Sequence, residues 1–529
     1  MIRKFEGANA FIVGSGIASL SAAVLLIRDG GFAGASICIL EELAVAGGAL
    51  DGSGTAERGY VTRGGRMWTE EAYVCLWNVL ASIPTLGDPA RTVKEDVWAF
   101  NDVWHSDSHA RLIGNGPTIL DAADLGFSVH DRLELMRLLA MGEHVIGARR
   151  IEDCFSPHFF GTHFWAMWRT TFAFQTWHSA IELRRYLLRF LQEFPRIHTL
   201  GGVRRTALNQ YDSVVRPMEQ WLVAHGVRFE FNTKVTDIEF ADAAEGRVIE
   251  AIHATRSGET IIYAVGSKDC AFITIGSMTA DSRTGDNDHA APLVRDKVDG
   301  AWTLWENMSR RTTGLGRPNT FNGNVDESKW LSFTLTMHTP ALVRRIEALT
   351  GNAPGTGGVM TFTDSGWLMS AVVPHQPHFA GQPDDVFTLW GYGLFIDHVG
   401  DVVDATMAAA TGQQILTELL HHLGCTDLLE EMRRTTTVIP VMMPYITSEF
   451  ARRDVADRPS VIPPGAANFA LMGQYVEIPE DVVFTVEYSV RSAMHAVYGV
   501  LGLDLEIPAI YHGIADPKVA FEAFRTLMG

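Results

Sequence analysis

The chain has 529 residues, a length at which two or three lobes are expected instead of a single core. Hydrophobic residues make up 47% and charged residues 20%, which is typical of a globular protein and argues against extensive disorder. The net charge of −19 and the lack of a dense Lys and Arg cluster argue against a nucleic-acid-binding protein and against electrostatic anchoring on anionic lipid.

The cysteines and the apolar segments indicate the cellular setting. The five cysteines are scattered, without a CxxC pair or another metal-ligand spacing, so we expect reduced thiols and no bound metal. The chain has no run of 18 apolar residues that could cross a membrane, and it opens without a signal peptide. These features predict a cytoplasmic protein of enzyme size, for which a peripheral contact with the inner face of the membrane stays open.

The first 42 residues carry a nucleotide-binding pattern. An apolar run at 10–13 predicts a buried strand, a glycine turn and a helical stretch follow it, and a second strand at 36–40 ends in an acidic pair. This is the order that a Rossmann-type nucleotide site requires. We therefore predict a dinucleotide-binding domain with a parallel sheet at the start of the chain.

Each small or acidic residue of this pattern has a physical task. Gly14 permits the tight turn, and Gly16 lets main-chain N–H groups approach a pyrophosphate at the positive end of the helix. Ser19 stands where a third glycine is common and is small enough for the helix to pack on the strand. Glu41, or alternatively Glu42, is expected to accept hydrogen bonds from the ribose hydroxyls.

Two further glycine-rich loops, at 47–54 and 63–66, favour FAD over NAD as the cofactor. Small residues let the chain run beside a large flat ring system, and arginines can balance phosphate or flavin charge. The alternative is that these loops are only flexible connections. A strand, a turn at Gly473 and a helix at 484–501 would close the site late in the chain, which predicts a discontinuous cofactor domain. The cofactor residues expected in these loops are Gly48, Arg63, Gly64, Gly65 and Arg66.

Several longer runs, in a fixed order over nearly the whole chain, resemble one family, the oleate hydratases, once called myosin-cross-reactive antigens. The resemblance implies a hydro-lyase that requires FAD without net redox and adds water across the cis-9 double bond of a long-chain fatty acid, turning oleate into 10-hydroxystearate. Ser277 lies in one of the runs and joins the expected cofactor residues. The runs are GSGIASL (14–20), GGALDGSG (47–54), RGGR (63–66), FAF (172–174), WHSA (177–180), NQY (209–211), GSMT (276–279), QPHF (376–379), LWGYGLF (389–395), PVMMPYITS (440–448) and VFTVEYSVR (483–491).

The resemblance assigns Tyr211, the tyrosine of the NQY run, as the proton donor. An isolated alkene has no carbonyl to polarise, so its protonation to a carbocation-like state is the hard step. A tyrosine is a weak acid with a usual pKa near 10, and we expect nearby cations or the flavin to assist it. The alternative is a buried structural tyrosine.

The family glutamate that follows RGGR is replaced by Met67 in this chain. A thioether can neither accept a proton nor strongly orient water. Three interpretations follow: Glu70 or Glu71 substitutes for it, water attacks the cation without a strong base, or the activity is weak or altered in scope. We favour attack without a strong base.

The resemblance also implies that His378 holds the fatty-acid carboxylate with two polar partners. Those two positions are Val372 and Pro374 in this chain, so the expected clamp has lost two contacts. Gln376 and His375 are the candidates to compensate. The alternative is that His378 only forms part of the structure.

Together these features predict an α/β fold with α+β lobes: a discontinuous Rossmann-type FAD domain, an inserted substrate lobe and a helical C-terminal part. A helix over 177–194 is expected to expose Arg184, Arg185 and Arg189. The chain begins almost at its first strand, without the N-terminal arm that relatives use in dimerisation, so monomer and homodimer both stay open. The expected cofactor parts are 1–100, 201–290 and 436–510, the substrate parts are 101–200, which is mostly helical, and 291–435, and the C-terminal segment is 511–529.

The rival interpretations are an FAD-dependent oxidoreductase, similar to an amine oxidase or a desaturase, and a non-catalytic lipid-binding flavoprotein. The first rests on the shared cofactor fold, because a fold alone does not fix the chemistry. The second rests on Met67 and the reduced carboxylate clamp. The expected partners are an unsaturated fatty acid and water.

Overall fold

Five short parallel strands form the sheet on which the glycine motif is built, in a computed structural model that describes residue 5, residues 7–65 and residues 67–528. Their order is β18-β11-β1-β2-β7, and the first two strands in the chain are completely buried. The strands predicted at 10–13 and 36–40 are confirmed, the second beginning one residue later. The bounds are β1 Ala10–Val13, β2 Ile37–Leu40, β7 Arg228–Glu230, β11 Cys270–Thr274 and β18 Phe469–Met472.

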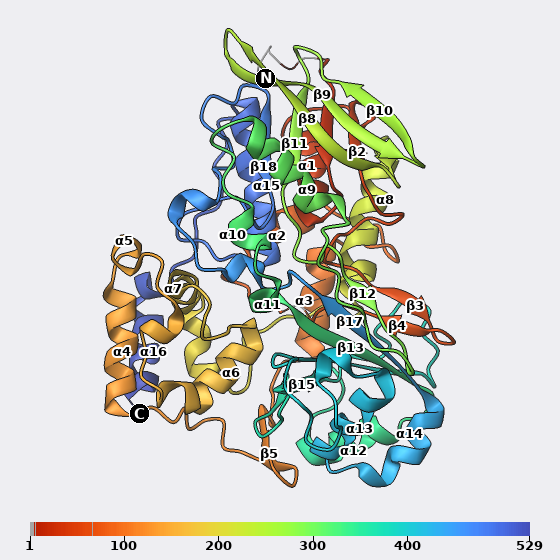
Figure 1. Ribbon diagram of the computed structural model, residues 1–529, viewed down its shortest axis with the longest axis vertical. Coiled ribbons are helices and arrows are strands. Elements are labelled where there is room, and N and C mark those ends of the chain that lie inside the picture. Colours follow the sequence, from red (N-terminus) through yellow and green to blue (C-terminus); the bar gives the residue numbers. More distant parts are fainter. Residues whose placement is uncertain (1–4, 6, 66, 529) are drawn as a thin grey trace.

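Helices cover this sheet, and a small antiparallel sheet adjoins it in the upper part of Figure 1. The helix predicted after the glycine turn packs against the late helix predicted near 484–501, so the two ends of the sequence share one core. The helices in contact with this sheet are α1 (Ile17–Arg28) and α15 (Val486–Leu501), and α9 (Gly300–Arg311) packs on the small sheet. The other helices of this part of the molecule and of its junction with the lower lobes are α2 (Val74–Leu80), α3 (Val93–Val103), α8 (Arg216–Ala224), α10 (Asn319–Asn322) and α11 (Val325–Ser328). The small sheet consists of β8 (Lys234–Ala243), β9 (Gly246–Arg256) and β10 (Glu259–Ala264).

An eight-stranded sheet builds the lobe at the lower right of Figure 1. Its order is β12-β17-β13-β16-β15-β14-β5-β6, and β3 (Ser53–Thr55) and β4 (Gly59–Val61) form a hairpin beside it. The strands are β5 (Leu112–Gly114), β6 (Thr118–Ile119), β12 (Arg283–Thr284), β13 (Trp330–Met337), β14 (Met360–Phe362), β15 (Met369–Val372), β16 (Phe387–Gly393) and β17 (Thr436–Met443). The helices of this lobe are α12 (Ala341–Thr350), α13 (Gly412–His422) and α14 (Leu429–Thr435).

The two faces of this sheet have different neighbours because successive side chains of a strand alternate. Leu335 and Leu389 pack into the core that α12, α13 and α14 complete. Trp330, Trp390 and Tyr392 lie in a separate cluster on the opposite face, together with residues of the glycine loops. The sheet therefore presents an aromatic face toward the five-stranded domain.

A helical lobe occupies the lower left of Figure 1, and the C-terminal helix returns to it. Arg132 of the lobe donates a hydrogen bond to the main-chain oxygen of Met528 at 2.7 Å. The helices are α4 (Val129–Ala140), α5 (Glu143–Ile146), α6 (His163–Phe172), α7 (Ala180–Arg189) and α16 (Pro517–Met528). The fold is therefore α/β, with a parallel Rossmann-type sheet and a helical C-terminal part, as the sequence predicts.

Several elements pair differently from the sequence-based boundaries. The strands β12 and β17 lie in the eight-stranded sheet, although 201–290 and 436–510 are predicted as cofactor parts, and α9 packs on β8, although 291–435 is predicted as a substrate part. A strand with mostly buried residues fits either sheet, so its pattern does not reveal its partner. The division of the chain into cofactor and substrate parts stays a proposal.

The expectation of exposed arginines on α7 is wrong for Arg185 and Arg189, whereas Arg184 is partly exposed. The side chains of Arg185 and Arg189 are only 2% and 1% exposed. Arg185 pairs with Glu143 at 2.7 Å and with Glu477 at 2.8 Å, and Arg189 lies 3.6 Å from Asp481. Buried cations require such partners, and two of them, Glu477 and Asp481, come from a segment almost 300 residues away, which helical periodicity cannot indicate.

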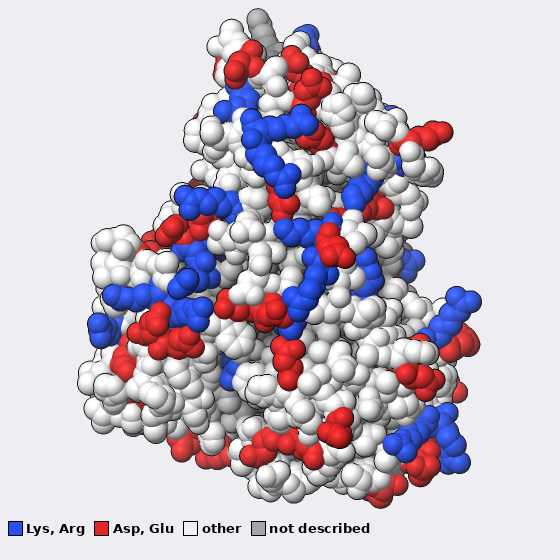
Figure 2. Space-filling view, viewed as in Figure 1, with Lys and Arg blue, Asp and Glu red and all other residues white. Residues whose placement is uncertain are grey.

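None of the helices in the described residues is both long enough and apolar enough to cross a bilayer. Basic and acidic side chains lie interspersed on the face of the molecule that Figure 2 shows.

Candidate functional site

A long cleft runs past the carboxyl ends of β1, β2, β11 and β18, which is the edge where open α/β sheets bind ligands. Most of the residues predicted to bind the cofactor line it. They are Gly14, Gly16, Glu41, Gly48, Arg63, Ser277 and Gly473. Ser19 lies beneath the cleft, fully buried, with its Oγ 3.0 Å from Oγ1 of Thr274, so it serves the packing of α1 on the sheet. Arg66 lies outside the described residues.

Glycines bring the main chain close to this cleft. Gly14 and Gly473 follow β1 and β18 with φ of +87° and +98°, conformations that other residues rarely adopt. Gly16 precedes α1 without a side-chain cap or an acidic residue in the first turn, so the first N–H groups stay available to an anion. A Cβ on Gly48 would lie 3.1 Å from Cα of Gly16, which shows how closely the two loops approach.

The two acidic residues at the end of β2 have different partners. Glu41 accepts hydrogen bonds from the main-chain N–H and the hydroxyl of Ser15, at 2.8 and 2.6 Å. Glu42 accepts a hydrogen bond from the N–H of Gly300 at 2.7 Å and lies 3.6 Å from Nζ of Lys234. The second carboxylate therefore caps α9, whereas the first is held against the glycine turn of the cleft.

Arg63 connects the loops that form the middle of the cleft. Its Nη2 donates to the main-chain oxygen of Gly48 at 2.7 Å, its Nη1 donates to that of Thr279 at 3.3 Å, and its Nε lies 2.9 Å from the carboxylate of Asp51. The guanidinium therefore holds three glycine-motif segments together as well as supplying charge.

A second cavity adjoins the cleft and shares Ala49, Leu50 and Phe484 with it. Its walls are mainly apolar and include the aromatic face of the eight-stranded sheet. The apolar lining consists of Met67, Phe100, Ala173, Trp330, Val359, Val372, Val373, Pro374 and Trp390, and the polar lining includes Asp51, Thr170, Thr171, Arg205, Thr206, Asn209, Gln210, His375, His378 and Tyr392. Gly64 and Gly65 line this cavity and not the nucleotide cleft. We call it the apolar cavity below.

The NQY segment reaches this cavity through its first two residues. Asn209 and Gln210 line the cavity, whereas Tyr211 is half-buried and lies outside the lining of both the cleft and the cavity. Tyr211 begins a π-helical turn, Tyr211–Val215, a rare conformation that concentrates at functional sites. Burial raises the pKa of the Tyr211 phenol above its usual value, and the carboxylate of Glu219 adds to the rise, so the phenol keeps its proton.

Met67 and Glu70 lie in different surroundings. Met67 lines the apolar cavity and also a smaller neighbouring pocket formed with Trp68 and Phe190. Glu70 is 57% exposed and pairs with Arg204 at 2.6 Å, away from the cavity. The structure does not bring Glu70 to the position that Met67 occupies.

Of the two residues predicted to hold the substrate carboxylate, His378 lines the apolar cavity and Gln376 does not. His378 lines the cavity, and burial, reinforced by the neighbouring His375, lowers its pKa to about 4, so the ring is neutral at neutral pH. Gln376 does not line the cavity, because its amide bridges the loop: Nε2 donates to the main-chain oxygens of Pro374 and Thr388 at 2.9 and 3.0 Å. Gln376 therefore shapes the loop that presents His378.

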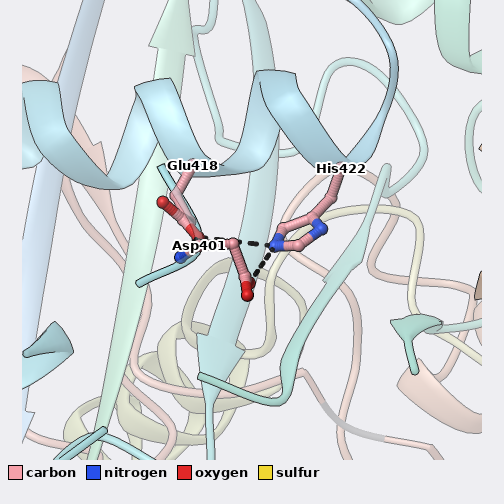
Figure 3. Close-up of side chains that lie close together, drawn as sticks. All are labelled: Asp401, Glu418 and His422. Carbon is pink, nitrogen blue, oxygen red and sulfur yellow. Dashed lines mark hydrogen bonds and ion pairs between the residues drawn. The ribbon is translucent and has the colours of Figure 1, made fainter. Parts of the chain in front are cut away.

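Among the described residues, one trio gathers three side-chain atoms of metal-binding type, Asp401, Glu418 and His422 (Figure 3). Its geometry is explained by a loop contact. The Glu418 carboxylate accepts main-chain hydrogen bonds from Asp401 at 2.5 Å and from Val403 at 3.1 Å, and Nε2 of His422 lies 3.2 Å from Oδ2 of Asp401. The trio fixes the 401–403 loop to α13 and lines neither the cleft nor the apolar cavity.

Comparisons with known proteins find relatives that match nearly the whole chain. It is 38% identical to an oleate hydratase of Streptococcus pyogenes serotype M49 (strain NZ131), over 99% of this chain and 91% of that protein. It is 33% identical to a linoleate hydratase of Lactiplantibacillus plantarum, over 98% of both chains. A cyclohexylamine oxidase from Brevibacterium oxydans IH-35A shares the fold, with a TM-score of 0.52 and 12% identity over 94% of this chain and 99% of that one. The MCRA family model matches residues 7–498, and the chain therefore belongs to the MCRA family.

Proposed function

We propose that the protein is an FAD-dependent hydratase of unsaturated long-chain fatty acids, with the conversion of oleate to 10-hydroxystearate as its reaction. The observation that carries the proposal is an apolar cavity that shares Ala49, Leu50 and Phe484 with a nucleotide cleft, in a chain related over its whole length to two hydratases. An elongated hydrocarbon suits an apolar cavity of this kind.

The residues of the cleft fit FAD. Gly14, Gly16 and the free N–H groups of α1 suit the pyrophosphate, and Glu41 suits the ribose. Gly48 and Arg63 lie where the cleft meets the apolar cavity, on the side proposed for the flavin ring. When bound, the flavin would supply a flat polar wall and an electrostatic influence on the cavity, since hydration involves no net transfer of electrons.

In the proposed reaction Tyr211 donates its phenolic proton to one alkene carbon and water adds to the other. The water then loses a proton, which restores the phenol, so atoms and charge balance. Burial keeps the Tyr211 phenol protonated at neutral pH, but its raised pKa also makes it a weaker acid than a free tyrosine, so in this proposal the bound flavin or a cation must assist the proton transfer. The role requires the phenol to turn into the cavity that Asn209 and Gln210 line.

Because Met67 cannot act as a general base, the proposed reaction proceeds without one. A carbocation is electrophilic enough for water to attack it without prior deprotonation, and an apolar wall excludes other nucleophiles. The placement of Glu70 at the surface, paired with Arg204, favours this interpretation over substitution by Glu70.

The test is incubation of the FAD-loaded protein with oleate in heavy-oxygen water. A hydroxy acid that carries the heavy oxygen, formed without consumption of an electron acceptor, is the expected product. An oxidised lipid formed with consumption of an acceptor would instead identify an oxidoreductase. Unchanged oleate, linoleate and palmitoleate, with the flavin spectrum intact, would identify a lipid-binding flavoprotein.

A further inference from the structure

Arg205 is a cation in the lining of the apolar cavity, and no acidic side chain among the described residues pairs with it. Its Nη1 donates to the main-chain oxygen of Gly355 at 3.0 Å, and its main chain exchanges hydrogen bonds with the side chain of Asn101. The carboxylate of the cavity, Asp51, is already paired with Arg63 at 2.9 Å. A desolvated charge without a counter-charge is unfavourable unless a ligand completes it.

Two more buried arginines stand behind the cavity wall. Arg111 donates to the main-chain oxygen of Val359 at 2.9 Å and to Oγ1 of Thr171 at 2.8 Å, and both of these residues line the cavity. Arg169 donates to Oε1 of Gln175 and interacts electrostatically with Tyr392, which lines the cavity. Neither guanidinium forms an ion pair within the part of the chain that the structure describes. Burial lowers the pKa of Arg111 and of Arg169 to about 10, so both remain charged at neutral pH.

The other buried arginines of the described chain provide the comparison. Arg453 and Arg458 each lie 3.1 Å from Glu182, and Arg491 lies 3.0 Å from Asp481. In a protein with 62 acidic residues, carboxylates are therefore placed beside these buried cations but, among the described residues, not beside Arg111, Arg169 or Arg205. Arg111, Arg169 and Arg205 together make the cavity a positive environment, which suits an anion.

Arg205 also belongs to a part of the cavity lining that the nucleotide cleft does not share. Arg205, Gly355 and His375 line the cavity but not the cleft. Gly355 accepts the hydrogen bond from Arg205. A Cβ on Gly355 would lie 2.8 Å from Cβ of His375, so the segments that carry Gly355 and His375 are in contact beside Arg205. A chain-like ligand with its charged end beside Arg205 would therefore extend toward the shared wall of the cleft.

We propose that Arg205 binds the carboxylate of the fatty acid and so sets how far the hydrocarbon chain reaches along the cavity. The inference rests on the proposed function for the identity of the ligand. The cation comes from the segment that precedes NQY and supplies a charge to a cavity in which Val372 and Pro374 offer no polar side chain. A guanidinium can hold both oxygens of a carboxylate, which gives it geometric as well as electrostatic selectivity.

The experiment compares the binding of oleate and oleyl alcohol to the flavin-loaded protein by calorimetry, without turnover. In Arg205→Leu, we expect the affinity for oleate to fall on the order of 100-fold, because a charged partner is lost, while the affinity for oleyl alcohol changes less than about 3-fold. Arg205→Lys should keep part of the preference for the acid. Arg204→Leu is the matched control, since Arg204 pairs with Glu70 at the surface, and it should bind oleate as the parent does.

Equal losses of affinity for the acid and the alcohol in Arg205→Leu would overturn the proposal and indicate a structural role for Arg205. An unchanged affinity for oleate would also overturn the proposal. The binding result is independent of hydration. If the parent binds oleate through Arg205 but forms no hydroxy acid, the proposed function is wrong and the role of Arg205 in binding the carboxylate stands. If the parent hydrates oleate equally well with and without Arg205, only the proposed role of Arg205 is wrong.

Discussion

Asn209 is joined to His378 by two hydrogen bonds that end on the same atom. Its main-chain N–H and its side-chain Nδ2 both donate to the main-chain oxygen of His378, at 2.8 and 3.0 Å. The same Nδ2 donates to Oδ2 of Asp212 at 2.7 Å, and Asp212 in turn accepts the N–H of Ala380 at 2.9 Å. The NQY segment and the loop that presents His378 are therefore one unit of the cavity wall.

Asn209→Ala should loosen this unit. The substitution leaves a carbonyl and a carboxylate with fewer partners in a half-buried setting, so we expect the free energy of unfolding to fall by about 1–3 kcal/mol. Urea denaturation measures the change, and hydration of oleate should slow because the wall that carries Tyr211 is less fixed. Asn115→Ala, at an exposed position, is the control and should stay within about 0.5 kcal/mol of the parent. Equal stabilities of the two variants would contradict the role of Asn209.

Tyr211→Phe should abolish hydration while the fold and the flavin spectrum persist, because only the phenolic hydroxyl is removed and the ring stays in place. The parent should show no alkaline loss of activity from this group below about pH 9, since burial raises the pKa of Tyr211 above its usual value near 10 and the phenol is active in its protonated form. The pH dependence of kcat measures this. An alkaline limb centred near pH 8 that disappears in a variant of another residue would show that a different acid is at work.

Met67→Glu tests whether the reaction needs a base. General-base catalysis typically contributes 10²–10⁴-fold, so an enzyme that lacked only this base would gain about that much from the new carboxylate. We expect less than about a 10-fold gain, because water can trap the cation unaided. We also expect lower stability at pH 8 than at pH 5, because the apolar wall disfavours the charged carboxylate. Met67→Gln controls for polarity without charge, and a gain of 100-fold in the glutamate variant alone would refute our interpretation.

The local parts of the fold were predictable from the sequence. The strands β1 and β2, the helix α1 and the turn at Gly14 follow from consecutive residues, whose apolar runs and glycines need no distant partner. The cleft residues Glu41 and Gly473 follow for the same reason, because each comes at the end of a strand of the parallel sheet.

The remaining features depend on partners that are distant in sequence. Arg185 was expected to be exposed because its carboxylate partner Glu477 lies 292 positions away. Two features are visible only once distant segments are placed together: Arg205 has no acidic partner within the described chain, and Asn209 is joined to His378. Hydrophobic periodicity reports that a face is covered, but not by which residues or charges.

Two buried glutamates should respond to pH in opposite directions. Burial raises the pKa of Glu449 to about 8, and its hydrogen bond from Tyr475, at 3.3 Å, does not offset this. Burial would also raise the pKa of Glu182, but the guanidiniums of Arg458 and Arg453, each at 3.1 Å, lower it to about 2. One carboxyl is therefore neutral and the other charged in the folded protein at pH 7.

The signs follow from the protons bound by each state. Between pH 4.5 and 8 the folded protein keeps a proton on Glu449 that the unfolded chain loses, so stability falls as pH rises, by about 1.4 kcal/mol per pH unit. Glu449→Gln removes this dependence, and its advantage over the parent should grow from pH 5 to pH 8. Glu182→Gln should instead lower stability throughout this range by about 3–5 kcal/mol, because Arg453 and Arg458 lose one of their two carboxylate partners and keep only Glu477. Urea denaturation at pH 5, 6, 7 and 8 measures both, and a constant difference between Glu449→Gln and the parent would mean that Glu449 is charged when buried.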